Sequence, residues 1–256
     1  MKKIQDFRVK DYQWLNENNY VIELQTEEEI PPIAAGNFAE LEIPNTKDVF
    51  LRRPLSILDV NYEQNSLSFY IKIAGKGTRK LGELARGEKI NLIYPLGNTF
   101  NTDATKKALI VGGGSGIAPF ILLARKLREQ NSEISFLFGA RTADEIFMTG
   151  AFGMFGEVML TTEDGSLGEK GLVTQHSIFR NANFDFDKIY TCGPDPMMKA
   201  ISYIAKEKDI PCEASLENMM ACGFGACLCC VVETSEGKNK CVCTEGPVFN
   251  VNDLAW

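Results

Sequence analysis

The sequence predicts a multi-domain β and α/β protein: an N-terminal antiparallel β-barrel, an α/β unit with a parallel sheet, and a small cysteine-rich C-terminal module. Three observations lead to this prediction. Short apolar runs separated by turn-forming residues fill the first part of the chain. Strand patterns then alternate with helical patterns. Finally, six of the eight cysteines lie after residue 220. We place the three units at residues 1–102, 103–211 and 212–256.

Composition limits the classes of function that fit this chain. Its 256 residues are 45% hydrophobic, enough for packed cores in one large or two ordinary domains. The net charge of −7 argues against nucleic acid as a partner, but backbone N–H groups can still hold a dinucleotide. No apolar run approaches the roughly 18 residues of a membrane span, and the N-terminus lacks a signal core. We therefore expect a cytoplasmic protein without a membrane partner, whose cysteines are metal ligands and reduced thiols.

The first unit shows strand patterns bounded by Gly, Pro and Asn residues, which is typical of a small antiparallel barrel. A short helix is expected at 79–85. Near the end of one strand, Arg53 offers a fork of donors to a phosphate, and Ser56 can donate to a phosphate or a flavin ring. An exposed basic pair before a strand is the alternative interpretation of this segment. The predicted strands are residues 20–25, 37–43, 67–73 and 89–94.

The second unit alternates strands with helices, which predicts βαβ units and a parallel sheet. A glycine run follows its first strand and opens its first helix. Without side chains there, the backbone can approach a pyrophosphate, and free N–H groups at the helix start can bind it. A turn needed only for packing is the alternative. The run does not fit G-x-G-x-x-G, which disfavours a standard Rossmann dehydrogenase. Its candidate binding residues are Gly112, Gly113, Gly114 and Gly116.

A second strand-to-helix turn contains Cys192, Gly193 and Pro194. Glycine and proline fix such a turn and leave the carboxyl edge of the parallel sheet open, where ligands bind in sheets of this kind. Cys192 could equally be an inert core thiol. The lone His176 has no partner visible in the sequence, so we expect a structural or surface role. No Ser/His/Asp set or pair of carboxylates suggests a catalytic residue.

The C-terminal cysteines carry the strongest chemical signal. Cys222, Cys227 and Cys230 form a C-x4-C-x2-C array, the leading spacing of a plant-type [2Fe–2S] site. Such a site needs a fourth cysteine further along, and on spacing alone both Cys241 and Cys243 can supply it. Small residues between the first two cysteines let the loop curl and point N–H groups at sulfur. The alternatives are a zinc site, which more often uses two separated cysteine pairs, and free buried thiols.

Together, these segments resemble the ferredoxin–NADP reductase superfamily through R-P-L-S, G-K-G-T, G-G-G-x-G-I-A-P and C-G-P-x-P-M-M. The tail M-A-C-G-F-G-A-C-L-C-C-V-V, followed by C-T-E-G-P-V-F, is similar to the electron-transfer subunits of class 1B dihydroorotate dehydrogenases. The resemblance covers nearly the whole chain. It implies a barrel that binds FAD, a nucleotide domain that binds NAD and a C-terminal [2Fe–2S] module.

The resemblance also implies roles for particular residues. Cys243 becomes the fourth cluster ligand, because in the family this cysteine precedes the x-[DE]-G-P-V-F run. Cys229 departs from the family pattern, which usually has a small residue there. Arg141 could meet a 2′-phosphate or an adenine, so the residues leave NAD and NADP open, and the family favours NAD. The implied FAD-binding residues are Arg53, Pro54, Leu55, Ser56, Tyr70, Ile71, Lys72, Gly77 and Thr78.

The function implied by the resemblance is electron transfer in pyrimidine biosynthesis. Electrons would pass from the FMN of a catalytic dihydroorotate dehydrogenase subunit through the cluster and FAD to NAD+. The expected assembly is a heterotetramer with two copies of each subunit, docked through the cluster module with Phe224 and Leu228 exposed. Two alternatives stay open: an electron-transfer subunit of another flavin and iron–sulfur reductase (ferredoxin, sulfide or hydrogen linked), and a nucleotide-sensing protein with structural zinc.

Overall fold

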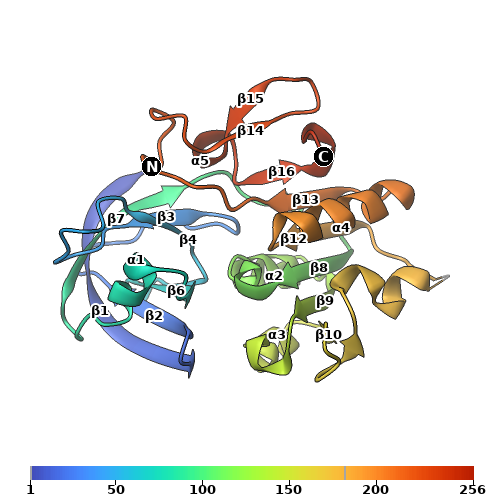
Figure 1. The fold of residues 1–256 in the computed structure, drawn as a ribbon, viewed down its shortest axis with the longest axis horizontal. Coiled ribbons are helices and arrows are strands. Elements are labelled where there is room, and N and C mark those ends of the chain that lie inside the picture. Colours follow the sequence, from blue (N-terminus) through green and yellow to red (C-terminus); the bar gives the residue numbers. More distant parts are fainter. Residues whose placement is uncertain (1, 182) are drawn as a thin grey trace.

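The computed structural model describes residues 2–181 and 183–256. It contains two seven-stranded sheets side by side and a small two-stranded sheet that lies over the junction between them (Figure 1). The N-terminal sheet is antiparallel and the second is mostly parallel, which confirms the predicted fold class.

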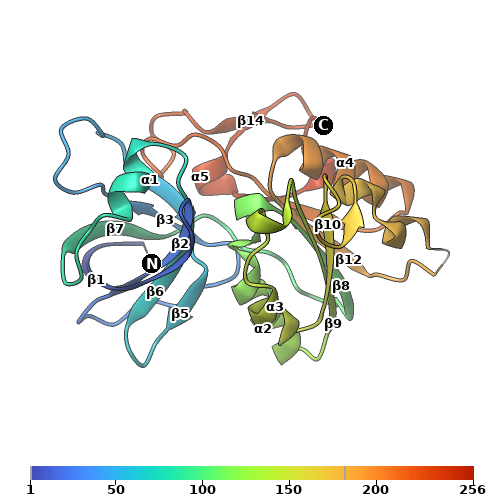
Figure 2. The same ribbon diagram turned by 60° about the horizontal axis from the view of Figure 1, so that its bottom comes forward.

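The first sheet has the order β4-β3-β7-β1-β2-β6-β5 and curves into a barrel whose ends are β4 and β5 (Figures 1 and 2). Alternating apolar side chains such as Ile22, Leu24 and Leu92 point into its interior and are fully buried. The strands are β1 (Lys3–Asn16), β2 (Asn19–Gln25), β3 (Phe38–Leu41), β4 (Arg53–Ser56), β5 (Asp59–Asn61), β6 (Ser66–Lys72) and β7 (Lys89–Leu96).

Three local predictions for this unit need correction. The first strand, β1, was not predicted, because the buried face at its start includes a polar residue, Gln5, which bonds Thr26 and Tyr94. The segment from Arg53 to Ser56, predicted to lie near the end of a strand, makes up the whole of the short strand β4. The helix expected at 79–85 is α1 (Lys76–Leu81), which starts earlier because the Thr78 hydroxyl accepts the N–H groups of Ala74 and Gly75.

The second sheet has the order β11-β10-β9-β8-β12-β13-β16, and only its last strand runs antiparallel. Residues on alternate sides of β8 enter two different hydrophobic cores. Helices α2 and α3 cover the face turned toward the barrel, and α4 covers the opposite face (Figure 1). The strands are β8 (Lys107–Gly113), β9 (Glu133–Ala140), β10 (Glu157–Thr162), β11 (Glu169–Lys170), β12 (Lys188–Cys192), β13 (Cys212–Ser215) and β16 (Val248–Asn250).

The helices of the second unit lie between its strands along the chain. Those that pack on the sheet are α2 (Phe120–Glu129), α3 (Thr149–Gly153) and α4 (Asp195–Glu207). Single turns of 3₁₀ helix occupy η1 (Gly114–Ile117), η2 (Ala143–Glu145), η3 (Val173–Gln175), η4 (Ser177–Arg180) and η5 (Val251–Asp253). Within the described residues, no helix is long and apolar enough to cross a bilayer.

The cysteine-rich segment forms a long loop, the hairpin β14 (Val231–Glu233) and β15 (Asn239–Cys241), and the short helix α5 (Val242–Glu245). The predicted boundary at residue 212 falls at the start of β13. Since β13 and β16 both belong to the second sheet, the loop is anchored to that sheet at both ends. One core joins Phe38 and Leu96 of the barrel to Cys230 and Cys243, so the module packs on both larger units.

Candidate functional site

Two cavities adjoin at the junction between the barrel and the second sheet. The barrel cavity, of about 380 Å³, lies between strands β4 and β6 and the chain that follows β13. The nucleotide cavity, of about 420 Å³, lies over the carboxyl edge of the parallel sheet. Lys72 lines both cavities. Groups bound in the two cavities would therefore come close to each other near Lys72.

Most of the residues predicted to hold FAD line the barrel cavity. Residues that sequence reasoning did not single out for this role complete it, chiefly Phe38, Pro247 and the segment from Ser215 to Met220. Ile71 is fully buried in the barrel core and does not line the cavity. The predicted residues that do line it are Pro54, Leu55, Ser56, Tyr70, Lys72 and Thr78.

Arg53 and Gly77 lie against each other beside this cavity. A Cβ atom at Gly77 would stand 2.7 Å from Arg53 Nε, so any larger residue would push the guanidinium away. The Arg53 Nη1 donates to the carbonyl of Leu51 at 2.8 Å. Strand β4 and the first turn of α1 thus bring a guanidinium and free N–H groups together, which fits a pyrophosphate.

The glycine run of η1 separates the two cavities. Gly113 and Gly114 line the nucleotide cavity, while Ser115 and Ala118 line the barrel cavity. Gly112 and Gly116 are packing positions, since a Cβ at Gly112 would stand 2.9 Å from Ile117 and one at Gly116 would run into the backbone of Cys192. Two of these glycines therefore allow close packing, and the other two leave the backbone open to the nucleotide cavity.

The second predicted turn closes the opposite side of the nucleotide cavity. Pro194 lines it, and Gly193, with φ +149°, leaves room for Met197 and for the backbone of Gly113. Cys192 is fully buried, and burial raises the pKa of its thiol well above the usual range. The structure therefore gives Cys192 the character of a protonated core thiol behind the cavity.

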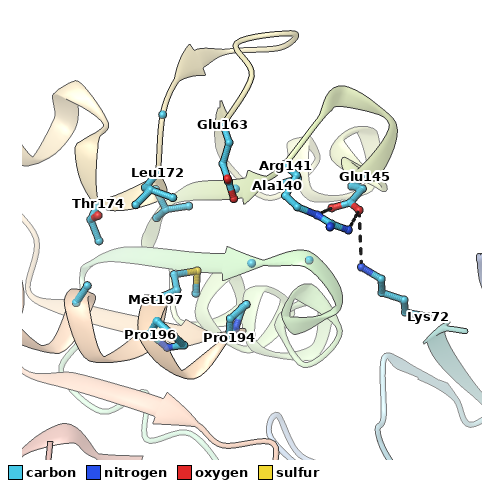
Figure 3. Close-up of a pocket in the computed structure, with 16 residues that line it drawn as sticks. Lys72, Ala140, Arg141, Glu145, Glu163, Leu172, Thr174, Pro194, Pro196 and Met197 are labelled. Atoms are coloured by element: carbon cyan, nitrogen blue, oxygen red, sulfur yellow. Dashed lines mark hydrogen bonds and ion pairs between the residues drawn. The ribbon is translucent and has the colours of Figure 1, made fainter. Parts of the chain in front are cut away.

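Charged side chains surround the mouth of the nucleotide cavity (Figure 3). Glu145 pairs with Arg141 at 2.6 Å and with Lys72 at 3.9 Å. The hydrogen bond from Arg141 holds the pKa of Glu145 below its usual range. Glu163 lines the same cavity, and Figure 3 shows its carboxylate directed into it. Neither glutamate was singled out from the sequence, because only the fold brings the ends of β9 and β10 together.

The cysteine loop directs backbone N–H groups at sulfur. The amides of Phe224, Cys227 and Ala226 donate to Cys222; although burial opposes them, together they lower the pKa of that thiol to about 6. Gly223 and Gly225 have φ values of +73° and +84°, which glycine adopts without strain. The predicted role of these glycines is therefore matched by the backbone geometry.

Cys243, on α5, faces the same loop. Its amide donates to Cys230 Sγ at 3.4 Å, and its own sulfur accepts the N–H of Gly225. Burial and the neighbouring Cys230 raise the pKa of Cys243 to about 12. A bound iron ion would favour the deprotonated form of Cys243, because a metal cation stabilises the thiolate.

Cys241 is the competing fourth ligand, and it also lies near Cys230. Its exposure is intermediate whereas Cys243 is buried, and its amide is bonded to Glu245 at 2.8 Å. Cys229 is exposed. The burial of Cys243 and the hydrogen bond from its amide to Cys230 Sγ favour it over Cys241.

The thiols of the predicted ligands lie in pairs, Cys222 beside Cys227 and Cys230 beside Cys243. A [2Fe–2S] cluster shares its four cysteines between two irons. Cys222, Cys227, Cys230 and Cys243 with their surrounding N–H groups fit that cluster.

His176 has a structural environment. It is buried, its Nδ1 accepts the N–H of Ile178 at 3.1 Å, and its Nε2 lies 3.3 Å from Glu169 Oε1. The partner that was not visible in the sequence is thus Glu169, and the imidazole caps η4.

Arg53→Ala is expected to lower FAD occupancy. A charged hydrogen bond to phosphate is worth ~1.5–3 kcal/mol, so FAD affinity should fall by about 10- to 150-fold. The check is a titration of the flavin-free protein with FAD. Arg52→Ala is the control, because Arg52 bonds Asn91 on the outer face of the barrel. Equal FAD affinity in Arg53→Ala and the unsubstituted chain would exclude this role.

Two family models match the chain. Residues 217–255 match the iron–sulfur cluster binding domain of dihydroorotate dehydrogenase B, and residues 110–203 match an oxidoreductase NAD-binding domain. A protein of Caldanaerobacter subterraneus subsp. tengcongensis is 41% identical over 210 residues, 81% of this chain and 82% of its own. One of Desulforamulus reducens is 35% identical over an alignment of 264 positions that covers 100% of both chains. Both are named dihydroorotate dehydrogenase B (NAD(+)), electron transfer subunit.

Solved structures share the same architecture. A chain from the structure of the NADH-dependent reduced ferredoxin-NADP oxidoreductase superposes with a TM-score of 0.87 and 29% identity, covering 98% of this chain and 90% of that one. The ferredoxin reductase of carbazole 1,9a-dioxygenase superposes with a TM-score of 0.69 at 21% identity, over 82% of this chain and 67% of its own, which shows a common fold.

Proposed function

The chain belongs to the family of dihydroorotate dehydrogenase B (NAD+) electron transfer subunits, and from this premise we propose the route and the residues by which it works. It is an oxidoreductase subunit that uses FAD, an iron–sulfur cluster and NAD. In the proposed route, electrons come from the FMN of a catalytic partner, pass through the cluster and FAD, and reduce NAD+. We also propose that the two subunits form a heterotetramer with two copies of each, and that this assembly is cytoplasmic.

The observation that carries this proposal is the continuity of three sites. The nucleotide cavity meets the barrel cavity at Lys72, and Met220, which lines the barrel cavity, lies two residues before Cys222. When bound, the cluster handles single electrons and the flavin converts them to a two-electron transfer to NAD+. Such a path needs short separations between its sites, and the adjacency of the three sites supports it.

The chain's own residues bind and orient the cofactors. In this proposal, Arg53 and the first turn of α1 hold the FAD pyrophosphate, while Ser56 and Tyr70 flank the flavin. Gly113, Gly114 and the start of η1 receive the NAD pyrophosphate. Cys222, Cys227, Cys230 and Cys243 hold the cluster. No residue of this chain is assigned to acid–base chemistry on dihydroorotate, which belongs to the partner.

Selection of NAD over NADP follows from the carboxylates of the nucleotide cavity. Arg141, the residue that could attract a 2′-phosphate, is paired with Glu145. Glu163 adds a second negative charge to the cavity. A carboxylate at the end of a strand can accept a hydrogen bond from the ribose 2′-hydroxyl, and it repels a phosphate at the same place. Glu163 is therefore the proposed selectivity residue.

Glu163→Gln is expected to raise the ratio of kcat/KM for NADPH to that for NADH by at least about tenfold, or 1.4 kcal/mol, because it removes this repulsion. The measurement is oxidation of each nucleotide with an artificial acceptor. Glu157→Gln, at the opposite end of β10, is the matched control. An unchanged ratio in Glu163→Gln would remove the residue from this role.

The docking surface proposed for the FMN subunit surrounds the cluster. Phe224 and Leu228 are 56% and 62% exposed, as predicted. An exposed apolar patch of this kind is typical of a protein interface. Its position beside Cys222, Cys227 and Cys230 would bring the partner's FMN near the cluster.

The visible spectrum and metal content of the purified chain test this function. A brown protein that contains flavin, iron and sulfide, with an EPR signal after reduction, is the expected result. A colourless protein that contains zinc would instead support the nucleotide-sensing alternative.

A further inference from the structure

The side chain of Glu40 is buried between the barrel and the cysteine loop. The residue is fully inaccessible to solvent, and neither carboxylate oxygen has a hydrogen-bond partner among the described residues. Glu40 lies in β3, opposite Ile93 of β7 and Pro54 of β4. A carboxyl group without partners in a core is costly, since burial in a weakly polar medium disfavours its charge. Barrel stability does not account for its presence.

The cysteine loop covers this carboxyl group. A Cβ atom at Gly223 would stand 2.8 Å from Glu40 Cγ and 3.3 Å from Glu40 Oε1, so only glycine lets the loop come this close. Gly223 directly follows Cys222. In the adjacent strand, Pro54, the partner of Glu40, lines the barrel cavity. Glu40 therefore lies next to the cysteine loop, and its strand partner Pro54 lines the proposed flavin site.

The neighbouring positive charges do not pair with Glu40. Arg52 donates to its backbone carbonyl at 3.3 Å, while the Arg52 guanidinium bonds Asn91 at 2.7 Å. Arg53 donates to the Leu51 carbonyl. Burial raises the pKa of the Glu40 carboxyl to about 7; the charges of Arg52 and Arg53 oppose the shift, and Cys222 adds to it. Because Glu40 is buried against Gly223, a charge on the cysteine loop acts on its carboxyl group across a poorly screened space.

We propose that the buried carboxylate of Glu40 lowers the reduction potential of the cluster. This inference rests on the proposed cluster function. Reduction adds one negative charge to the cluster. A nearby carboxylate makes that addition less favourable and lowers the potential, and net charge near a cluster is one of the factors that set it. The carboxylate therefore favours onward transfer of each electron from the cluster to the flavin.

The test is an EPR-monitored redox titration of Glu40→Gln in the full chain with its cofactors. We expect the cluster potential to rise by at least about 59 mV, which corresponds to a tenfold change in the oxidised-to-reduced ratio of a one-electron couple. The titration is run at about pH 8.5, above the Glu40 pKa of about 7, so that the unsubstituted carboxylate is charged. Glu40→Leu, also uncharged, should shift the potential in the same direction.

Glu42→Gln is the matched control, because Glu42 directly follows β3 but its side chain is 54% exposed and paired with Arg52 at 3.4 Å. It should leave the potential unchanged. A Glu40→Gln potential equal to that of the unsubstituted chain would overturn the proposal. Loss of the cluster from both uncharged variants would also overturn it, since Glu40 would then act on loop stability. A missing cluster in the unsubstituted chain would instead overturn the proposed function itself.

Discussion

Replacing Cys243 by serine is expected to remove the [2Fe–2S] cluster, while Cys241→Ser keeps it. Cys243 is buried, accepts the N–H of Gly225 and donates its own amide to Cys230 Sγ. Cys241 is partly exposed, and its amide is bonded to Glu245. Substitution of a residue that only hydrogen-bonds a metal ligand commonly lowers metal affinity by about 10- to 100-fold. Loss of a ligand itself should therefore reduce cluster content by at least about tenfold.

Iron content and the EPR signal of the reduced protein measure this effect in each of the eight cysteine variants. Serine at Cys222, Cys227 or Cys230 should also remove the cluster, and Cys229→Ser should retain it. FAD content serves as the check on folding. A cluster that survives Cys243→Ser but disappears in Cys241→Ser would show that the fourth ligand was assigned to the wrong cysteine.

The double substitution Phe224→Glu and Leu228→Glu is expected to weaken binding to the FMN subunit by at least about 30-fold. Apolar residues at the centre of an interface commonly contribute ~2 kcal/mol or more, and an introduced carboxylate would have to be desolvated. Affinity is measured by gel filtration and by titration of one subunit with the other, with the reduced-cluster EPR signal as proof that the module is intact.

Tyr203→Glu is the control for this experiment, because Tyr203 is 57% exposed on α4, away from the cysteine loop. It should bind the partner normally. Equal affinity of the double variant and the unsubstituted chain would place the docking surface elsewhere on the molecule.

The sequence predicted those features that depend on local patterns. The strand–glycine–helix order at residues 108–128 and the helix after Pro194 appear as expected, because apolar periodicity and turn residues act over short distances. Cysteine spacing within a loop is equally local, so the array from Cys222 to Cys230 could be recognised without a fold.

Features that depend on long-range contacts were not predictable. Glu40 reads as one polar residue in a short strand, and only the packing of Gly223 on β3 shows that it is buried without a partner. Glu145 and Glu163 become a pair of charges in one cavity only when β9 and β10 align in parallel. Likewise, the return of the chain into the second sheet through β16 follows from its pairing with β13.

Orotate formation with NAD+ as the acceptor tests the proposed electron route from the FMN subunit through this chain to NAD+. This chain, an FMN-containing dihydroorotate dehydrogenase subunit and their mixture are each supplied with dihydroorotate and NAD+, and orotate and NADH are measured together. We expect orotate formation coupled to NADH formation only in the mixture, while this chain alone still oxidises NADH with an artificial acceptor. Orotate formation by this chain alone, or a mixture that forms neither a complex nor orotate, would contradict it.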